Sequence, residues 1–262
     1  MSYADVNGMN LYYEIHGTGR PLVLLHGGLG SGEMFGPNLD ALAASRQVIV
    51  PDLQGHGRTA DIDRPLDVRL MGDDIAALID HLGLDRPDLV GYSLGAGVAM
   101  QVAFHHPEKI GRLVAASAGI RRDATYPEIL AQQGQVGAAA AEFMKETPMW
   151  ELYNRVAPHP EDFPKLLDKI GQSMAKDFDY TEQVRALSVP TMIVAGDADM
   201  WPVSHFTEVF KLLDGGLRDG GWQGENRPKG GHALAILPGV THYSMGTSPL
   251  LPVVTLEFLK ES

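Results

Sequence analysis

The sequence contains no cysteine among its 262 residues. Disulfides, zinc–thiolate sites and a cysteine nucleophile are therefore excluded. No uninterrupted apolar run approaches the ~20 residues that a membrane-spanning helix requires, so we expect no membrane partner. The first ten residues contain neither a basic segment nor an apolar stretch. They do not resemble a secretory signal, and we expect a cytoplasmic protein.

Basic residues are also few. The chain has 21 Lys and Arg residues against 33 Asp and Glu residues, which gives a formal net charge of −12. Its largest basic cluster is the pair Arg121 and Arg122. Because a nucleic-acid partner requires a basic face, we expect none. The length fits one large domain or a core with a modest insertion.

What the chain does contain is a series of short apolar runs separated by helical patterns. Asn7 and Gly8, which accept positive φ, lie between two strand-like segments and predict an N-terminal antiparallel hairpin. Asp67–His81 and Leu94–His105 show helical patterns. The alternation of strand and helix predicts an α/β fold with a mostly parallel, doubly wound sheet. Six later runs are apolar without alternation, as parallel strands covered on both faces require: Leu22–Leu25, Val48–Val50, Leu89–Val90, Leu113–Ala116, Met192–Ala195 and Ala233–Leu237.

This pattern is interrupted between residues 121 and 187. The segment has helix-like pieces separated by prolines and no strand-like run. We interpret residues 121–187, called the cap segment below, as a helical cap inserted into a core formed by residues 1–120 and 188–262. Residues 214–231 are rich in glycine and lack periodicity, which predicts a flexible surface loop.

The strongest chemical signal is the run Gly91-Tyr92-Ser93-Leu94-Gly95, which follows a strand-like segment and precedes a helical one. A serine that attacks a carbonyl must project from a sharp strand-to-helix turn. Such a turn strains the serine backbone and leaves room only for small residues two positions away on each side. Ser93 is therefore the candidate nucleophile.

A second signal is His26-Gly27-Gly28-Leu29-Gly30, at the end of the strand Leu22–Leu25. Glycines allow the backbone to form a loop whose N–H groups face a substrate oxygen. We expect the N–H groups of Gly28 and Leu94 to form an oxyanion hole. His26 is expected to brace this loop by hydrogen bonding and not to transfer protons.

A serine hydroxyl needs a base, and the base needs a partner that orients it. Among the ten histidines, His242 is best placed, because it follows the last strand, at the edge where open α/β sheets bind their ligands. His232 precedes that strand and should lie at the opposite edge.

Asp199 is the candidate for the acid that orients the base. It follows the strand Thr191–Ala195 in the run Gly196-Asp197-Ala198-Asp199. Asp197 is interpreted as a residue that caps the turn. Asp123, which follows the preceding strand, stays open as an alternative acid.

Together these motifs resemble the α/β-hydrolase fold family, through HGGLG, VIVPDLQGHGRT, GYSLGAG, GDADMWP and LPGVTH in that order. The resemblance covers residues 1–120 and 188–262 and implies the family's order of nucleophile, acid and base. It is strongest toward bacterial carboxylesterases and the cofactor-free, haloperoxidase-like perhydrolases. One departure is the long separation between Asp199 and His242, which the glycine-rich segment explains if it loops out beside the site.

The sequence therefore predicts a serine hydrolase that cleaves small to medium, uncharged carboxylic esters and needs neither a metal nor a cofactor. Leu29, Met144 and Trp150 are expected to contact the substrate. For the apolar residues of the cap segment, the alternative that they only attach the cap to the core is equally compatible with the sequence. A lactonase, a perhydrolase, a C–C bond hydrolase and a non-catalytic ligand-binding protein stay open as alternatives. A homo-oligomer is compatible with the sequence.

Overall fold

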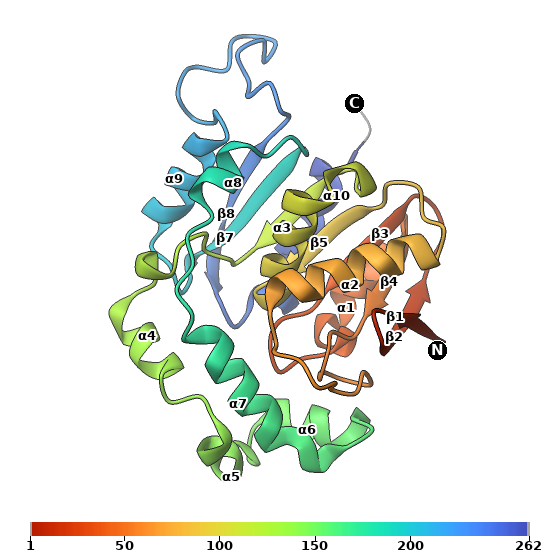
Figure 1. Ribbon diagram of the computed structural model, residues 1–262. Coiled ribbons are helices and arrows are strands. Elements are labelled where there is room, and N and C mark those ends of the chain that lie inside the picture. The colour runs from red at the N-terminus through yellow and green to blue at the C-terminus, as the bar shows by residue number, and fades with distance from the viewer. Residues whose placement is uncertain (1, 261–262) are drawn as a thin grey trace.

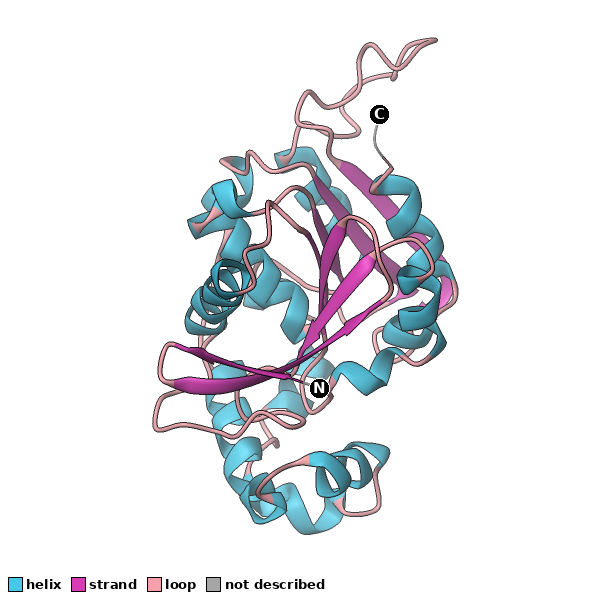
Figure 2. Ribbon diagram, turned by 90° about the vertical axis from the view of Figure 1, so that its right-hand side faces the viewer, coloured by secondary structure: helices cyan, strands magenta, loops and turns pink. Residues whose placement is uncertain are grey.

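The computed structural model describes residues 2–260 and has at its centre an eight-stranded sheet with helices on both faces (Figures 1 and 2). Only the first two strands run antiparallel to their neighbours, and all other pairs are parallel. From one edge to the other the strands are β1 (Ser2–Val6), β2 (Met9–His16), β4 (Gln47–Pro51), β3 (Pro21–Leu25), β5 (Asp88–Tyr92), β6 (Leu113–Ala116), β7 (Thr191–Ala198) and β8 (Ala233–Thr241).

The predicted hairpin connects β1 and β2. Asn7 and Gly8 form its turn with φ values of 48° and 77°, the left-handed conformation that this residue pair tolerates. The expectation of a mostly parallel, doubly wound sheet with an N-terminal antiparallel hairpin is confirmed.

Both faces of the sheet are covered, which explains the continuous apolar runs. Along β3, Leu22 and Leu24 belong to one buried cluster, whereas Val23 and Leu25 belong to the other. Side chains alternate across a strand, so a strand buried on both faces needs apolar residues at every position. One face is covered by α1 (Pro37–Ala43) and α10 (Leu250–Phe258), and the other by α2 (Val68–His81), α3 (Leu94–His105) and α9 (Val203–Leu212).

The cap segment is helical. In Figure 1 its helices α4 to α7 lie along the lower side of the molecule, beyond the ends of the strands. Within this segment the structure shows no strand of the sheet, and only an isolated bridge joins Arg121 to Asp179. Its helices are α4 (Pro127–Gln133), α5 (Ala141–Met144), α6 (Pro148–Val156), α7 (Phe163–Met174) and α8 (Thr181–Arg185).

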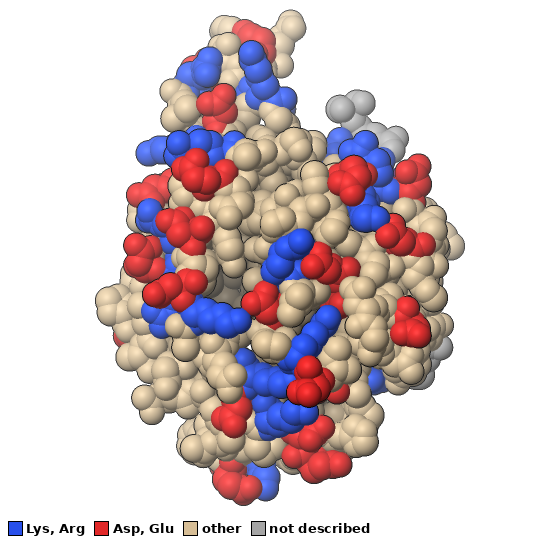
Figure 3. Space-filling view, in the orientation of Figure 1, with Lys and Arg blue, Asp and Glu red and all other residues tan. Residues whose placement is uncertain are grey.

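Charged side chains connect the cap segment to the rest of the chain. The Lys169 ammonium group on α7 donates to both carboxylate oxygens of Asp61, at 2.9 and 2.7 Å, and to the carbonyls of Ile62 and Arg64, at 2.8 and 2.7 Å. Arg155 on α6 pairs with Glu33 at 2.6 Å. Figure 3 shows basic side chains gathered in the lower centre of this face, where α6 and α7 meet the core.

The glycine-rich segment connects α9 to β8. It extends from the top of the molecule in Figure 1, at the end of the sheet opposite to α4–α7. Among the helices of residues 2–260, none is both long enough and apolar enough to cross a lipid bilayer.

Candidate active site

Ser93 lies on the tight turn between β5 and α3. Its φ and ψ angles are 54° and −116°, a strained conformation for a residue with a side chain. A methyl group on Gly91 would overlap the carbonyl oxygen of Gly95, and one on Gly95 would overlap the carbonyl oxygen of Leu25. The expectation that only small residues fit on both sides of this serine is confirmed.

The structure brings Ser93, His242 and Asp199 together from three separate strand ends. Ser93 Oγ lies 3.0 Å from His242 Nε2, and His242 Nδ1 lies 3.1 Å from Asp199 Oδ1. His242 and Asp199 are both buried. This chain of hydrogen bonds has the geometry of a nucleophile, its base and the acid that orients the base.

Three further donors hold the Asp199 carboxylate. The Ser117 hydroxyl donates to Oδ2 at 2.6 Å, and the N–H groups of Gly196 and Met200 donate at 3.2 and 2.7 Å. Burial raises the pKa of Asp199, but its hydrogen bonds and electrostatic interactions, the strongest of them with His242 and Ser117, together outweigh burial and hold this pKa below its ordinary value. Asp199 is therefore ionised at neutral pH. Ser117 was not among the expected site residues.

Tyr92 positions His242 through a hydrogen bond to its backbone. Its hydroxyl donates to the backbone carbonyl of His242 at 2.7 Å, and the two rings lie 5.6 Å apart. A methyl group on Gly27 would lie 2.8 Å from the Tyr92 ring, so the glycine loop can approach the site only without a side chain at this position. The residue before the nucleophile thus positions both the base and the loop.

The two expected oxyanion donors lie next to the nucleophile. Gly28 and Leu94 both line the same cavity as Ser93 and His242. Leu94 is the first residue of α3, so its N–H group has no acceptor within the helix and lies at the positive end of the helix dipole. Among the described residues, no acceptor binds the Gly28 N–H group. Both groups are suited to stabilise an oxyanion.

His26 is fully buried beneath this loop. Its Nδ1 lies 2.8 Å from the Gly27 carbonyl oxygen, and its Nε2 accepts a hydrogen bond from Leu53 N–H at 3.0 Å. Burial lowers the pKa of His26 to about 4, so the ring is neutral at physiological pH. The expectation that His26 braces the loop is confirmed.

The alternative site residues lie elsewhere. His232 accepts a hydrogen bond from Thr191 N–H at 3.2 Å, at the other end of the sheet from His242, as expected. Asp123 is exposed and forms an ion pair with Arg121 at 3.4 Å. Asp197 is also exposed. Across residues 2–260, no group of three His, Asp or Glu side chains is arranged to hold a metal ion.

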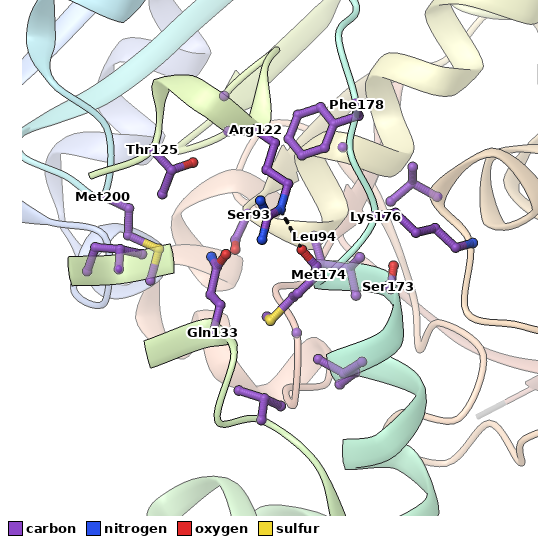
Figure 4. A pocket seen from close by; sticks show the side chains of 18 of the residues that line it. Ser93, Leu94, Arg122, Thr125, Gln133, Ser173, Met174, Lys176, Phe178 and Met200 are labelled. Atoms are coloured by element: carbon purple, nitrogen blue, oxygen red, sulfur yellow. Dashed lines mark hydrogen bonds between the residues drawn. The ribbon is translucent and has the colours of Figure 1, made fainter. Parts of the chain in front are cut away.

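A cavity of about 540 Å³ opens above Ser93, between the strand ends and the cap segment. Figure 4 shows side chains from both parts pointing into it, among them Arg122, Gln133, Met174 and Met200. The apolar part of its lining is extensive and includes Leu66, Met71, Met100, Ile129, Val136, Ile170, Phe178, Trp201 and Tyr243.

The three expected substrate contacts need correction. Among the described residues that line the cavity, Leu29, Met144 and Trp150 do not occur. Trp150 packs edge-on against Phe163 at 4.9 Å, which joins α6 to α7, and Met144 on α5 packs against the buried cluster. Both residues therefore serve packing, the alternative that the sequence left open.

The glycine-rich segment lies away from the site. The sequence left open whether residues 214–231 loop out beside it; they lie at the opposite end of the sheet, and no residue of this fully described segment lines the cavity. The insertion precedes β8, so it lengthens the chain between Asp199 and His242 without separating them in space. The 3.1 Å contact between these two side chains is therefore compatible with the long separation in sequence.

Several residues that line the cavity were missed. Trp201 lies two positions after the acid and Tyr243 directly follows the base, and the Trp201 ring lies 5.8 Å from the His242 ring. Their positions beside the triad in sequence could have indicated them. Arg122 and Gln133 lie in the cap segment, which contains no recognisable motif, and only their place in the fold reveals them.

Comparisons with known proteins agree with this architecture. A family model described as alpha/beta hydrolase fold matches residues 20–168. A curated relative, the putative carbamate hydrolase RutD of Azorhizobium caulinodans, is 30% identical over 237 residues, which cover 84% of this chain and 87% of the relative.

Solved structures resemble the whole chain. A hydrolase from Pseudomonas aeruginosa is 26% identical, with a TM-score of 0.71 over 99% of this chain and 98% of that protein. The enol-lactonase from Burkholderia xenovorans is 20% identical, with a TM-score of 0.71 over 99% of this chain and 100% of that protein. At this identity the second likeness establishes the fold alone.

Proposed function

Because this chain belongs to the α/β-hydrolase fold family, we propose that it is a serine hydrolase that cleaves small to medium carboxylic esters through an acyl-enzyme intermediate. The observation that carries this proposal is the continuous chain of hydrogen bonds from Ser93 Oγ through the His242 ring to the Asp199 carboxylate. The cavity volume of about 540 Å³ matches small and medium substrates.

In the first half of the reaction, Ser93 Oγ attacks the ester carbonyl while His242 Nε2 accepts the hydroxyl proton. Asp199 accepts a hydrogen bond from His242 Nδ1 and stabilises the imidazolium that forms. The N–H groups of Gly28 and Leu94 stabilise the negative charge on the substrate oxygen. His242 then donates its proton to the departing alkoxide, and the alcohol leaves as the acyl group stays on Ser93.

In the second half, a water molecule takes the place of the alcohol. His242 Nε2 accepts a proton from this water as its oxygen attacks the acyl carbonyl carbon. The bond between Ser93 Oγ and the acyl carbon then breaks, and the serine oxygen recovers its proton from His242. The carboxylic acid leaves, and the site returns to its starting state.

Carbamate hydrolysis is the second candidate. The same nucleophile and oxyanion donors can attack a carbamate carbonyl, and the relative that is 30% identical over most of both chains bears the name of a putative carbamate hydrolase. Lactone, perhydrolase and C–C bond chemistry would use the same serine as well. Activity against a panel of esters, carbamates and lactones, assayed by acid release, therefore identifies the substrate class.

Replacement of Ser93 by alanine tests the proposed mechanism. We expect turnover of a chromogenic butyrate ester to fall by a factor on the order of 10⁶ and labelling by a fluorophosphonate to be lost. Ser204→Ala is the matched control, because Ser204 is exposed on α9 and lies outside the cavity lining. If Ser93→Ala retained most of the activity, or if the wild-type protein resisted the fluorophosphonate, the mechanism would be wrong.

A further inference from the structure

Arg122 is a charged side chain in a largely apolar cavity. It follows β6, and its guanidinium group enters the cavity that also contains Ser93. Figure 4 shows Arg122 and Gln133 pointing into this space from different elements, on the side of the cavity that faces Ser93. Ligand cavities that are mostly apolar contain only a few polar groups, and these groups determine the orientation of the substrate.

The contacts of Arg122 leave some of its guanidinium N–H groups available to bind a ligand. Its Nε–H donates to the Met174 carbonyl at the end of α7, at 3.1 Å, which fixes the side chain in the cavity. Nη1 lies 3.6 Å from a carboxylate oxygen of Asp177, whose side chain is 96% exposed. Among the described residues, none accepts a hydrogen bond from Nη2. A guanidinium group fixed at one edge can bind a carboxylate with its remaining N–H groups.

The other charges in the cavity lining offset one another. Lys176 forms an ion pair with Asp67 at 3.0 Å. Burial raises the pKa of Asp67, but the hydrogen bond and charge of Lys176 and the backbone N–H of Arg69 together outweigh burial and hold the pKa below its ordinary value, so the carboxylate stays ionised. Asp177 opposes Arg122, yet its exposed carboxylate is screened by water and can turn away. Arg122 is thus the cation with the weakest local compensation.

We propose that Arg122 binds a carboxylate on the acyl part of the substrate, so that the preferred class is the monoesters of short dicarboxylic acids. This inference rests on the proposed function and departs from the expectation of uncharged esters. Ser93 attacks the ester carbonyl at one end of the acyl chain while Arg122 holds the charged end, and the methylene groups between them contact the apolar walls. The Gln133 amide can donate to the same carboxylate.

A pair of substrates with the same shape isolates the charge. The para-nitrophenyl monoester of glutaric acid ends in a carboxylate, and para-nitrophenyl 5-methylhexanoate has an isopropyl group of similar shape at that position. The measured quantity is the ratio of kcat/KM for the charged ester to kcat/KM for the neutral ester. A ratio is insensitive to the fraction of protein that is folded.

We expect this ratio to exceed one in the wild-type protein and to fall about 10- to 100-fold in Arg122→Gln, because a charge-assisted hydrogen bond is lost. Asp177→Asn removes the opposing carboxylate and should raise the ratio about twofold. Arg121→Gln is the control: it removes the same charge from the neighbouring residue, which pairs with Asp123 and lies outside the cavity lining, and it should leave the ratio unchanged.

The proposal is overturned if the wild-type protein prefers the neutral ester, if the ratio survives in Arg122→Gln, or if Arg121→Gln lowers it as much. Failure to hydrolyse either ester would instead refute the proposed function. If neither ester is hydrolysed, the role of Arg122 can still be tested by ligand binding, which needs no turnover. Glutarate should raise the Tm of the wild-type protein more than 5-methylhexanoate does, and Arg122→Gln should lose this difference. If glutarate and 5-methylhexanoate raised the Tm equally in the wild-type protein, or if Arg122→Gln kept the difference between them, the proposal would also be overturned.

Discussion

Replacement of Ser117 by alanine removes the hydroxyl group that donates to Asp199 Oδ2 at 2.6 Å. Ser117 is fully buried, and its backbone has φ of 53°, in the left-handed region. Asp199 keeps the N–H donors of Gly196 and Met200 in the variant, so the carboxylate stays buried and partly satisfied. The variant therefore weakens the support of the acid without disconnecting it from His242.

A hydrogen bond to a charged group is worth about 1.5–3 kcal/mol. We expect the free energy of unfolding of Ser117→Ala to fall by about that amount. In the proposed mechanism the ionised Asp199 stabilises the imidazolium of the transition state, and a loss of about 1.4 kcal/mol there lowers kcat/KM about tenfold. Removal of the hydroxyl also raises the pKa of Asp199, because one of the hydrogen bonds that lower it is gone.

The companion variant Ser117→Gly separates this catalytic effect from stability. It also lacks the hydroxyl but carries no Cβ in the left-handed conformation, so we expect it to be more stable than Ser117→Ala by about 1 kcal/mol. Urea unfolding gives the stabilities, and hydrolysis of para-nitrophenyl butyrate gives kcat/KM. Both variants should lose activity equally. Unchanged activity in Ser117→Ala, or activity that follows stability between the two variants, would refute the reasoning.

Two further predictions concern the surroundings of the triad. Tyr92→Phe removes the 2.7 Å hydrogen bond to the His242 carbonyl, and burial raises the pKa of the Tyr92 phenol so that it is a donor at every assay pH. We expect the free energy of unfolding to fall by about 1 kcal/mol and kcat to fall with little change in KM. An unchanged kcat would contradict this prediction. Burial lowers the pKa of both His26 and His56 from 6.5 to about 4, so the stability that their neutral rings provide is present above pH 6.5 and is lost as the pH falls toward 4. Each ring then costs about 3 kcal/mol at pH 4, and urea unfolding that is equally stable at pH 7 and pH 4.5 would contradict this prediction.

The parts of the fold that the sequence predicted share one physical property: each is determined by local chemistry. Parallel strands covered on both faces must be apolar at every position, so their runs stand out. The turn at Ser93 requires glycine at positions 91 and 95, because any side chain there would overlap the backbone. By contrast, α10 is apolar on nearly all sides and α1 has only 7 residues, so neither shows the amphipathic pattern that predicts a helix.

The contacts that could not be predicted depend on packing between distant segments. Ser117 and Asp199 are separated by 82 positions, and no local pattern links them. Trp150 and Met144 are large and apolar, like many residues that line substrate pockets, but they pack against other apolar side chains. The sequence does not separate the two roles, because an apolar side chain is compatible with both. Only the orientation of α5 and α6 decides between them.

This difference explains why the residues of the candidate site could be predicted from the sequence more readily than the residues that line the rest of the cavity. The candidate site residues follow the pattern of strands and helices in the core: Ser93, Asp199 and His242 directly follow β5, β7 and β8, Leu94 begins α3, and Gly28 lies in the loop after β3. The opposite wall of the cavity comes from cap helices, whose residues need only be compatible with packing and water. Under the proposed mechanism, a substitution in this wall would change which acyl group fits and leave Ser93 in place, so the charges in the assembled cavity determine the substrate preference.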